Sequence, residues 1–132
     1  DGTRTFYARF VNPDAMDGEI GSLRYSVMIY VDITNAVSKY EESYNTITSM
    51  GEYELISEFS IMEDSPVSLF VKRDIEDGYE LRFLSRTRNI YTDALGFTSI
   101  SGSVDRESTL SQFIDLMNSL HFQALDKFLV LN

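Results

Sequence analysis

Three arginine side chains stand close together in this chain, at Arg82, Arg86 and Arg88. The protein as a whole is acidic, with 21 acidic and 11 basic side chains and a formal net charge of −10. A guanidinium group is planar and carries several N–H donors, so it binds carboxylates and small anions well. In an extended segment these alternate positions share one face, and Tyr91 adds a stacking surface or a hydroxyl donor. We therefore predict a binding site formed by Arg82, Arg86, Arg88 and Tyr91.

The expected partner of this predicted site is a protein, a carboxylate-bearing peptide or a small anion. The alternative is internal pairing, in which Glu54, Glu58 or Glu80 on adjacent strands neutralises the arginines and the row only balances an acidic sheet. A row of guanidinium groups at roughly 7 Å spacing is repulsive unless acids or an anionic partner compensate it. The two hypotheses differ structurally, because internal pairing leaves no free donors.

Signatures of covalent, metal or nucleotide chemistry are absent from the sequence. There is no cysteine, which excludes disulfides, thiolate metal sites and a cysteine nucleophile. Neither a G-x-S-x-G nor an S-x-x-K motif occurs, and no glycine-rich phosphate loop is present. The single histidine, His121, stands at the end of a predicted helix, where it can cap backbone carbonyls. We predict no catalytic residue and no cofactor.

An acidic loop at residues 14–19 is the best candidate for a cation site, through Asp14, Asp17 and Glu19. Calcium prefers such oxygen-rich loops. The spacing of a calcium-binding loop is missing, however, because Ala15 and Met16 separate the two aspartates. We favour an ordinary solvated loop and predict no metal site.

The charge and the hydropathy of the chain limit its partners. A sequence pI near 4.4 argues against nucleic acid and against an anionic membrane face, because both bind mainly through basic side chains. No apolar run approaches the roughly 20 residues that a membrane helix needs, so we expect no membrane insertion. The first residue is Asp1 and not methionine. We expect an exported mature domain, periplasmic or lipoprotein-anchored, with a cytoplasmic location as the alternative.

A chain of 132 residues is predicted to form one domain over residues 1–132, large enough for a single core. Apolar and polar side chains alternate over residues 4–11 and 23–31, which predicts two antiparallel strands. The spacing then changes to three- and four-residue steps, which predicts an amphipathic helix through Val37, Tyr40, Tyr44 and Ile47. Asp32, Thr34 or Asn35 is expected to cap this helix, and Gly51 to end it.

Strand patterns return in the second half of the chain. Alternation over residues 53–61 predicts one strand, and residues 67–71 and 79–83 predict a hairpin around an Asp-Gly turn. A further strand is expected over residues 97–104. Residues 86–96 stay ambiguous, although Ile90 and Tyr91 are compatible with a continuing sheet. A closing helix is predicted by the apolar stripe Leu110, Phe113, Ile114, Met117 and Leu120.

The element order is therefore β-β-α-β-β-β-(β)-α. This order predicts the α+β class, with a single antiparallel sheet of about six strands and two main helices packed on it. The side chains expected to be mostly buried are Tyr25, Val27, Ile29, Leu55, Phe59, Leu69, Val71, Leu81, Phe83, Phe113, Ile114 and Met117.

The C-terminal third, IYTDALGFTSISGSV followed by a helix ending in FIDLMNSLHF, resembles the PsbP/Mog1-like families, including the DcrB-type bacterial lipoproteins. The shared features are the element order and the ending Ser119-Leu120-His121-Phe122. The resemblance implies an accessory or binding role, since members of these families are mostly non-enzymatic. It transfers no functional residue, because no functional motif of these families is matched.

The sequence thus favours a non-enzymatic accessory or interaction domain, part of an exported protein or lipoprotein. One alternative is a cytosolic acidic adaptor or secretion chaperone, because small size and low pI are typical of that class. A second alternative is a small enzyme with an unrecognised carboxylate site. The oligomeric state is left open by the sequence.

Overall fold

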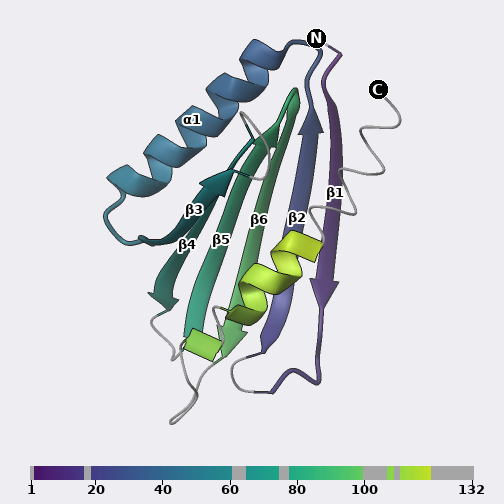
Figure 1. Ribbon diagram of the computed structural model, residues 1–132. Coiled ribbons are helices and arrows are strands. Elements are labelled where there is room, and N and C mark those ends of the chain that lie inside the picture. The colour runs from purple at the N-terminus through teal and green to yellow at the C-terminus, as the bar shows by residue number, and fades with distance from the viewer. Residues whose placement is uncertain are drawn as a thin grey trace.

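A computed structural model describes residues 2–16, 19–60, 65–74, 78–99, 107–108 and 111–119 (Figure 1). At residues 72–74 and 99 the description covers the backbone and not the side chains. The strands are β1 (Arg4–Val11), β2 (Ile20–Ile29), β3 (Glu54–Ser60), β4 (Pro66–Asp74), β5 (Gly78–Thr87) and β6 (Ile90–Ser99). Helix α1 spans Ile33–Ser49. Residues 111–119 are also helical and are called the C-terminal helix below.

The six strands form one sheet in the order β1-β2-β6-β5-β4-β3, and every neighbouring pair is antiparallel. This arrangement confirms the predicted α+β class, the antiparallel sheet and the order of elements. Strands β3 to β6 follow one another as a meander. Helix α1 connects β2 to β3, so the chain crosses the sheet and starts the meander at the far edge.

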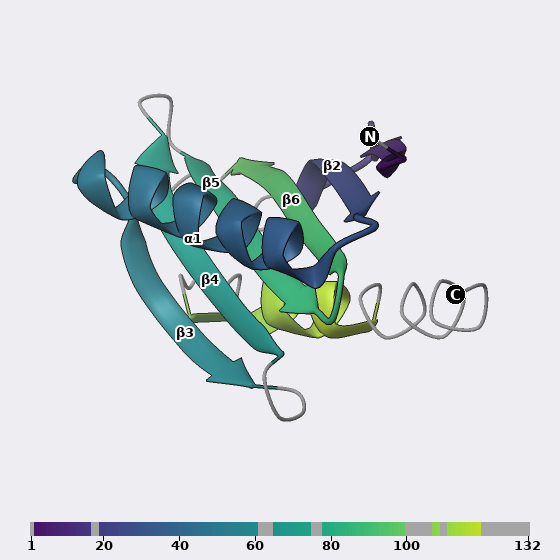
Figure 2. The same ribbon diagram turned by 90° about the horizontal axis from the view of Figure 1, so that it is seen from above.

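The two helices lie on opposite faces of the sheet, as the view from above shows (Figure 2). On the α1 face, Tyr40 and Ile47 pack with Phe70, Leu84 and Tyr91. On the other face, the C-terminal helix inserts side chains into a larger cluster made of Leu23, Val67, Leu69, Val71, Leu81, Phe83, Ala94, Phe113 and Met117. The strands in the middle of the sheet are therefore covered on both faces.

Helix α1 begins and ends as its sequence predicts. The Asp32 side chain accepts a hydrogen bond of 2.8 Å from the Thr34 backbone N–H, which makes Asp32 the N-cap. The last helical carbonyls are followed by Gly51 with a φ of 71°, a left-handed conformation that glycine adopts without steric cost. Several threonines lower the intrinsic stability of the helix, so packing through Tyr40 and Ile47 must supply much of it.

A buried hydrogen bond fastens α1 to the sheet. The hydroxyl groups of Tyr40 and Ser68 lie 2.6 Å apart, and Ser68 is fully buried. Tyr40→Phe is expected to lower the free energy of unfolding by about 1–2 kcal/mol, because it leaves the Ser68 hydroxyl without this partner in the core. Denaturant titration measures the loss. The Tyr40→Phe/Ser68→Ala double variant should recover part of it, and a double variant less stable than Tyr40→Phe would contradict this role.

The strand predicted at residues 97–104 begins earlier in the chain, at Ile90. Strand β5 continues to Thr87, and β6 begins at Ile90, so most of the ambiguous stretch is regular sheet. Thr87 pairs with Ile90 across a two-residue turn formed by Arg88 and Asn89. Arg88 has a φ of 54°, although such turns usually place glycine or asparagine at positive φ. Residues 100–104 lie outside the described part of the chain.

Most of the predicted core is confirmed. Eight of the predicted side chains are buried: Val27, Ile29, Leu69, Val71, Leu81, Phe83, Phe113 and Met117. Tyr25, Phe59 and Ile114 are half-buried. The prediction for Leu55 was wrong, since this side chain is 42% exposed. The register shifts between Leu55 and Ser57, so strict alternation fails there, and Leu55 and Phe59 end on opposite faces of β3.

Candidate functional site: an exposed edge strand flanked by arginines

The predicted row of Arg82, Arg86 and Arg88 is only partly formed. Arg82 and Arg86 lie on β5 and share the α1 face with Leu84. Strand β5 ends at Thr87, and Arg88 is in the turn with positive φ, so it does not continue the row. The assumption of an unbroken extended segment fails at this turn.

Two of these arginines are held by internal contacts. The Arg82 guanidinium donates to Asp93 on β6, with Nη2 and Oδ2 3.1 Å apart, in a partly exposed ion pair. Arg86 is only 3% exposed, and its Nη1 donates to the backbone carbonyl of Arg88 over 2.9 Å. The internal partner of Arg82 is thus an aspartate on the neighbouring hairpin strand, and not one of the three predicted glutamates.

Glu80, one of those glutamates, has a different contact. Its carboxylate accepts a hydrogen bond from the Tyr53 hydroxyl. Burial raises the pKa of Glu80 above its ordinary value, while the nearby positive charge of Arg82 acts in the opposite direction. Glu80 therefore connects β5 to Tyr53, the residue that precedes β3, on the α1 face.

Tyr91 is opposite Arg86 in the register of β5 and β6, and it lies beneath α1 at 1% exposure. Burial raises the pKa of its hydroxyl strongly. Arg86 and Tyr91 are both inaccessible to a ligand unless α1 moves. Binding of an anion at the four predicted residues stays a prediction, and in this conformation only Arg82 and Arg88 reach solvent.

The sheet register creates a different row of arginines, across the strands. Arg9 on β1 is directly opposite Arg24 on β2. Arg24 and Arg82 are both opposite Leu95 on β6, so Arg9, Arg24 and Arg82 occupy one line across the α1 face. We call these three residues the cross-strand arginine row. Its middle and outer members, Arg24 and Arg9, are exposed.

The Arg9–Arg24 pair is unusual for neighbouring strands. Like charges directly opposite each other destabilise a pair of strands. Strands β1 and β2 contain three arginines and no carboxylate. Within the described ranges, neither Arg9 nor Arg24 has an ion-pair partner. These two guanidinium groups are available to an anionic group from outside.

Strand β1, which carries Arg9 of this pair, forms one edge of the described sheet. Nearly all of its side chains are exposed, on both faces. They include four large apolar residues that are 42–64% exposed: Phe6, Tyr7, Phe10 and Val11. An edge strand has a row of unpaired backbone N–H and C=O groups, which is a template for pairing with another strand. The outer side of β1, with these side chains, is called the β1 edge below.

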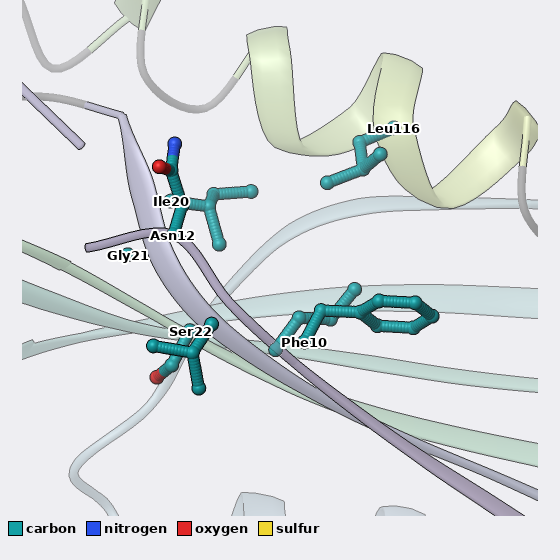
Figure 3. Close-up of a pocket in the computed structure, with 8 residues that line it drawn as sticks. Phe10, Asn12, Ile20, Gly21, Ser22 and Leu116 are labelled. Atoms are coloured by element: carbon teal, nitrogen blue, oxygen red, sulfur yellow. The ribbon is translucent and has the colours of Figure 1, made fainter. Parts of the chain in front are cut away.

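On the face opposite the arginines, the β1 edge borders an apolar cavity of about 270 Å³. Phe10, Ile20 and Leu116 point into this space from β1, β2 and the C-terminal helix (Figure 3). The wall is mainly hydrocarbon, with Asn12 and Ser22 at its polar margin. An apolar side chain that lies beside Phe10 would find a hydrophobic surface there.

The sequence also offered His121 and the acidic loop at residues 14–19 as candidates. His121 and Asp17 lie outside the described residues. In the acidic loop, the Glu19 carboxylate accepts a hydrogen bond of 3.0 Å from the Met16 backbone N–H, so it stabilises the turn. No group of acidic or histidine side chains suited to a metal ion occurs in the described ranges. None of the helices described is both long enough and apolar enough to cross a membrane.

Sequence inspection missed Arg9 and Arg24 because they are far apart in the chain and meet only through the register of two hairpin strands. A signal was available once the two strands were taken as an antiparallel pair. Each strand has an arginine on its polar side, and pairing Phe10 with the buried Leu23 on the opposite face brings the two arginines opposite each other. The register of β1 and β2 depends on the conformation of the loop between them, and local sequence patterns do not reveal that conformation.

The chain has no significant match among family models, curated proteins or solved structures. The class of this protein is therefore defined by its structure alone: the described part of the chain has an α+β fold, with one six-stranded antiparallel sheet between two helices. Its most distinctive surface in the described part is the β1 edge with Arg9 and Arg24.

Proposed function

We propose that this protein is an interaction domain that binds an extended segment of a partner protein along the β1 edge. The observation that carries the proposal is that β1 is an eight-residue edge strand with large apolar side chains exposed on both faces. Strand addition at a sheet edge uses backbone hydrogen bonds for affinity and alternate side chains for specificity. The proposal involves no catalytic step.

The two faces of β1 define the chemistry of the partner. Side chains of an added strand alternate between faces. On the α1 face they meet Arg9 and Arg24, which favour a carboxylate. On the other face they meet Phe10 and the adjoining cavity, which favour an apolar side chain. The expected ligand is an extended segment in which acidic and apolar residues alternate.

A short synthetic peptide of alternating glutamate and valine is a suitable probe. We expect it to bind and to slow hydrogen exchange at backbone amides of β1. The matched control peptide has lysine in place of glutamate and should bind about tenfold more weakly, because like charges face each other at Arg9. Equal binding of the two peptides, or binding that leaves β1 exchange unchanged, would contradict the proposal.

A further inference from the structure

We propose that the segment pairing with β1 is strand β3 of a second copy of this chain, so that the sheet continues from one molecule to the next. This inference rests on the proposed function of the β1 edge and specifies the partner. Strand β3 is the other edge of the described sheet. Its sequence, ELISEFS, is itself an extended segment that combines acidic and apolar residues.

The charges of the two edges are complementary. Strand β1 carries Arg4 and Arg9 and no acid, whereas β3 carries Glu54 and Glu58 and no base. Pairing β1 with β1, or β3 with β3, places like charges in adjacent strands, which is unfavourable. Pairing β1 with β3 places opposite charges in adjacent strands. The charge pattern thus disfavours both like pairings and favours the mixed one.

The strand directions also fit. Each of the neighbouring pairs from β1 to β3 is antiparallel, and the sheet has six strands, so β1 and β3 run in opposite directions. When a second copy extends the sheet in the same orientation, its β1 is therefore antiparallel to β3 of the first. Antiparallel pairing is the arrangement already present between all neighbours in this sheet.

The faces match as well. Glu58 is opposite Ser68, whose hydroxyl contacts Tyr40 of α1, so Glu58 and Arg9 share the α1 face. Phe59 is opposite Val67 and packs with the cluster on the other face, which is also the face of Phe10. A continued sheet would therefore place a carboxylate near a guanidinium on one face and two phenylalanine rings near each other on the opposite face.

The register of β3 limits the contact to part of the strand. The shift between Leu55 and Ser57 interrupts regular pairing, whereas residues 57–60 pair with β4 without interruption. Glu58 is exposed and accepts one hydrogen bond of 3.0 Å from the Tyr44 hydroxyl. A carboxylate has further acceptor positions, so this bond leaves Glu58 able to receive a guanidinium.

Such a contact joins two different surfaces, so it is heterologous and does not end at a dimer. It produces either a ring or an open chain of molecules. At an ionic strength of about 0.15 M the Debye length is about 8 Å, so repulsion between the net charges of two copies is largely screened while a close ion pair is less affected. We expect assembly under these conditions to increase with protein concentration.

Sedimentation velocity on the full chain, from micromolar to millimolar concentration, tests this inference. The wild-type protein should form species larger than a dimer. Arg9→Glu and Glu58→Lys should each weaken association about tenfold, because each places like charges across the contact. The double variant Arg9→Glu/Glu58→Lys exchanges the two charges and should restore association. Tyr44→Phe, which removes the hydrogen bond to Glu58 and keeps its charge, should associate as the wild type does.

Several results would overturn the inference: a wild-type chain that stays monomeric, a species that stops at a dimer, or a double variant that associates no better than its parents. The proposed function is tested separately, because the glutamate–valine peptide reports on β1 alone. A monomeric chain that binds this peptide at β1 contradicts self-assembly and keeps the interaction domain. A chain that neither assembles nor binds the peptide contradicts both.

Discussion

Phe113→Ala is expected to lower the free energy of unfolding by about 3–5 kcal/mol. The Phe113 ring is fully buried and belongs to the cluster between the sheet and the C-terminal helix. Its Cε1 atom would be 3.4 Å from a Cβ placed on Gly96, so the ring lies directly on the β6 backbone. Removing the ring leaves a cavity that rigid strands cannot close, which adds to the lost burial.

Denaturant titration of the variant provides the measurement, and Leu116→Ala is its matched control. Leu116 is on the same helix but 36% exposed, so its truncation should cost about 1 kcal/mol or less. A loss well below 1 kcal/mol for Phe113→Ala would show that the helix presents a different side to the sheet. Similar losses for the two variants would show the same.

Arg86→Ala is expected to destabilise the protein by about 3 kcal/mol, although arginine is usually a surface residue. Arg86 is almost completely buried and donates to the Arg88 carbonyl in the turn that joins β5 to β6. The alanine variant removes the donor from this carbonyl and the packing of the long side-chain stem. Arg86→Met keeps much of that packing, so the difference between the two variants measures the packing contribution.

Arg88→Ala is the control for this prediction, because the Arg88 side chain is exposed and only its backbone carbonyl accepts from Arg86. Its effect on stability should stay within about 0.5 kcal/mol. If Arg86→Ala instead leaves the stability unchanged and abolishes binding of an anionic ligand, Arg86 belongs to a binding site and our structural interpretation of this residue is wrong.

The sheet could be predicted where one face of a strand is covered and the other is open. In β2, for example, Leu23 and Val27 are buried while Arg24 is exposed, and this contrast is visible as alternation in the sequence. Strand β6 lacks the contrast, because Tyr91 and Ala94 are buried on opposite faces. Its turn also lacks glycine, since Arg88 occupies the position of positive φ. For both reasons, the sequence pattern did not show that β6 begins at Ile90.

The candidate site was predictable only in its chemistry. The arginines of this acidic protein indicated an anion-binding site, but the prediction considered only arginines that are close together in the chain. The structure buries Arg86, ends the strand before Arg88, and groups Arg82 with Arg9 and Arg24 through cross-strand pairing. Such a grouping depends on the order and register of strands, which long-range pairing determines and local patterns do not contain.

Hydrogen exchange along β1 shows whether the β1 edge binds an extended strand of acidic and apolar residues. The measurement compares amide exchange at Thr5–Val11 with and without the glutamate–valine peptide. If the β1 edge binds the peptide, exchange slows at those β1 amides that point away from β2 and changes little in α1. Unchanged exchange in β1 while the peptide protects α1 or the Arg88–Asn89 turn would contradict it.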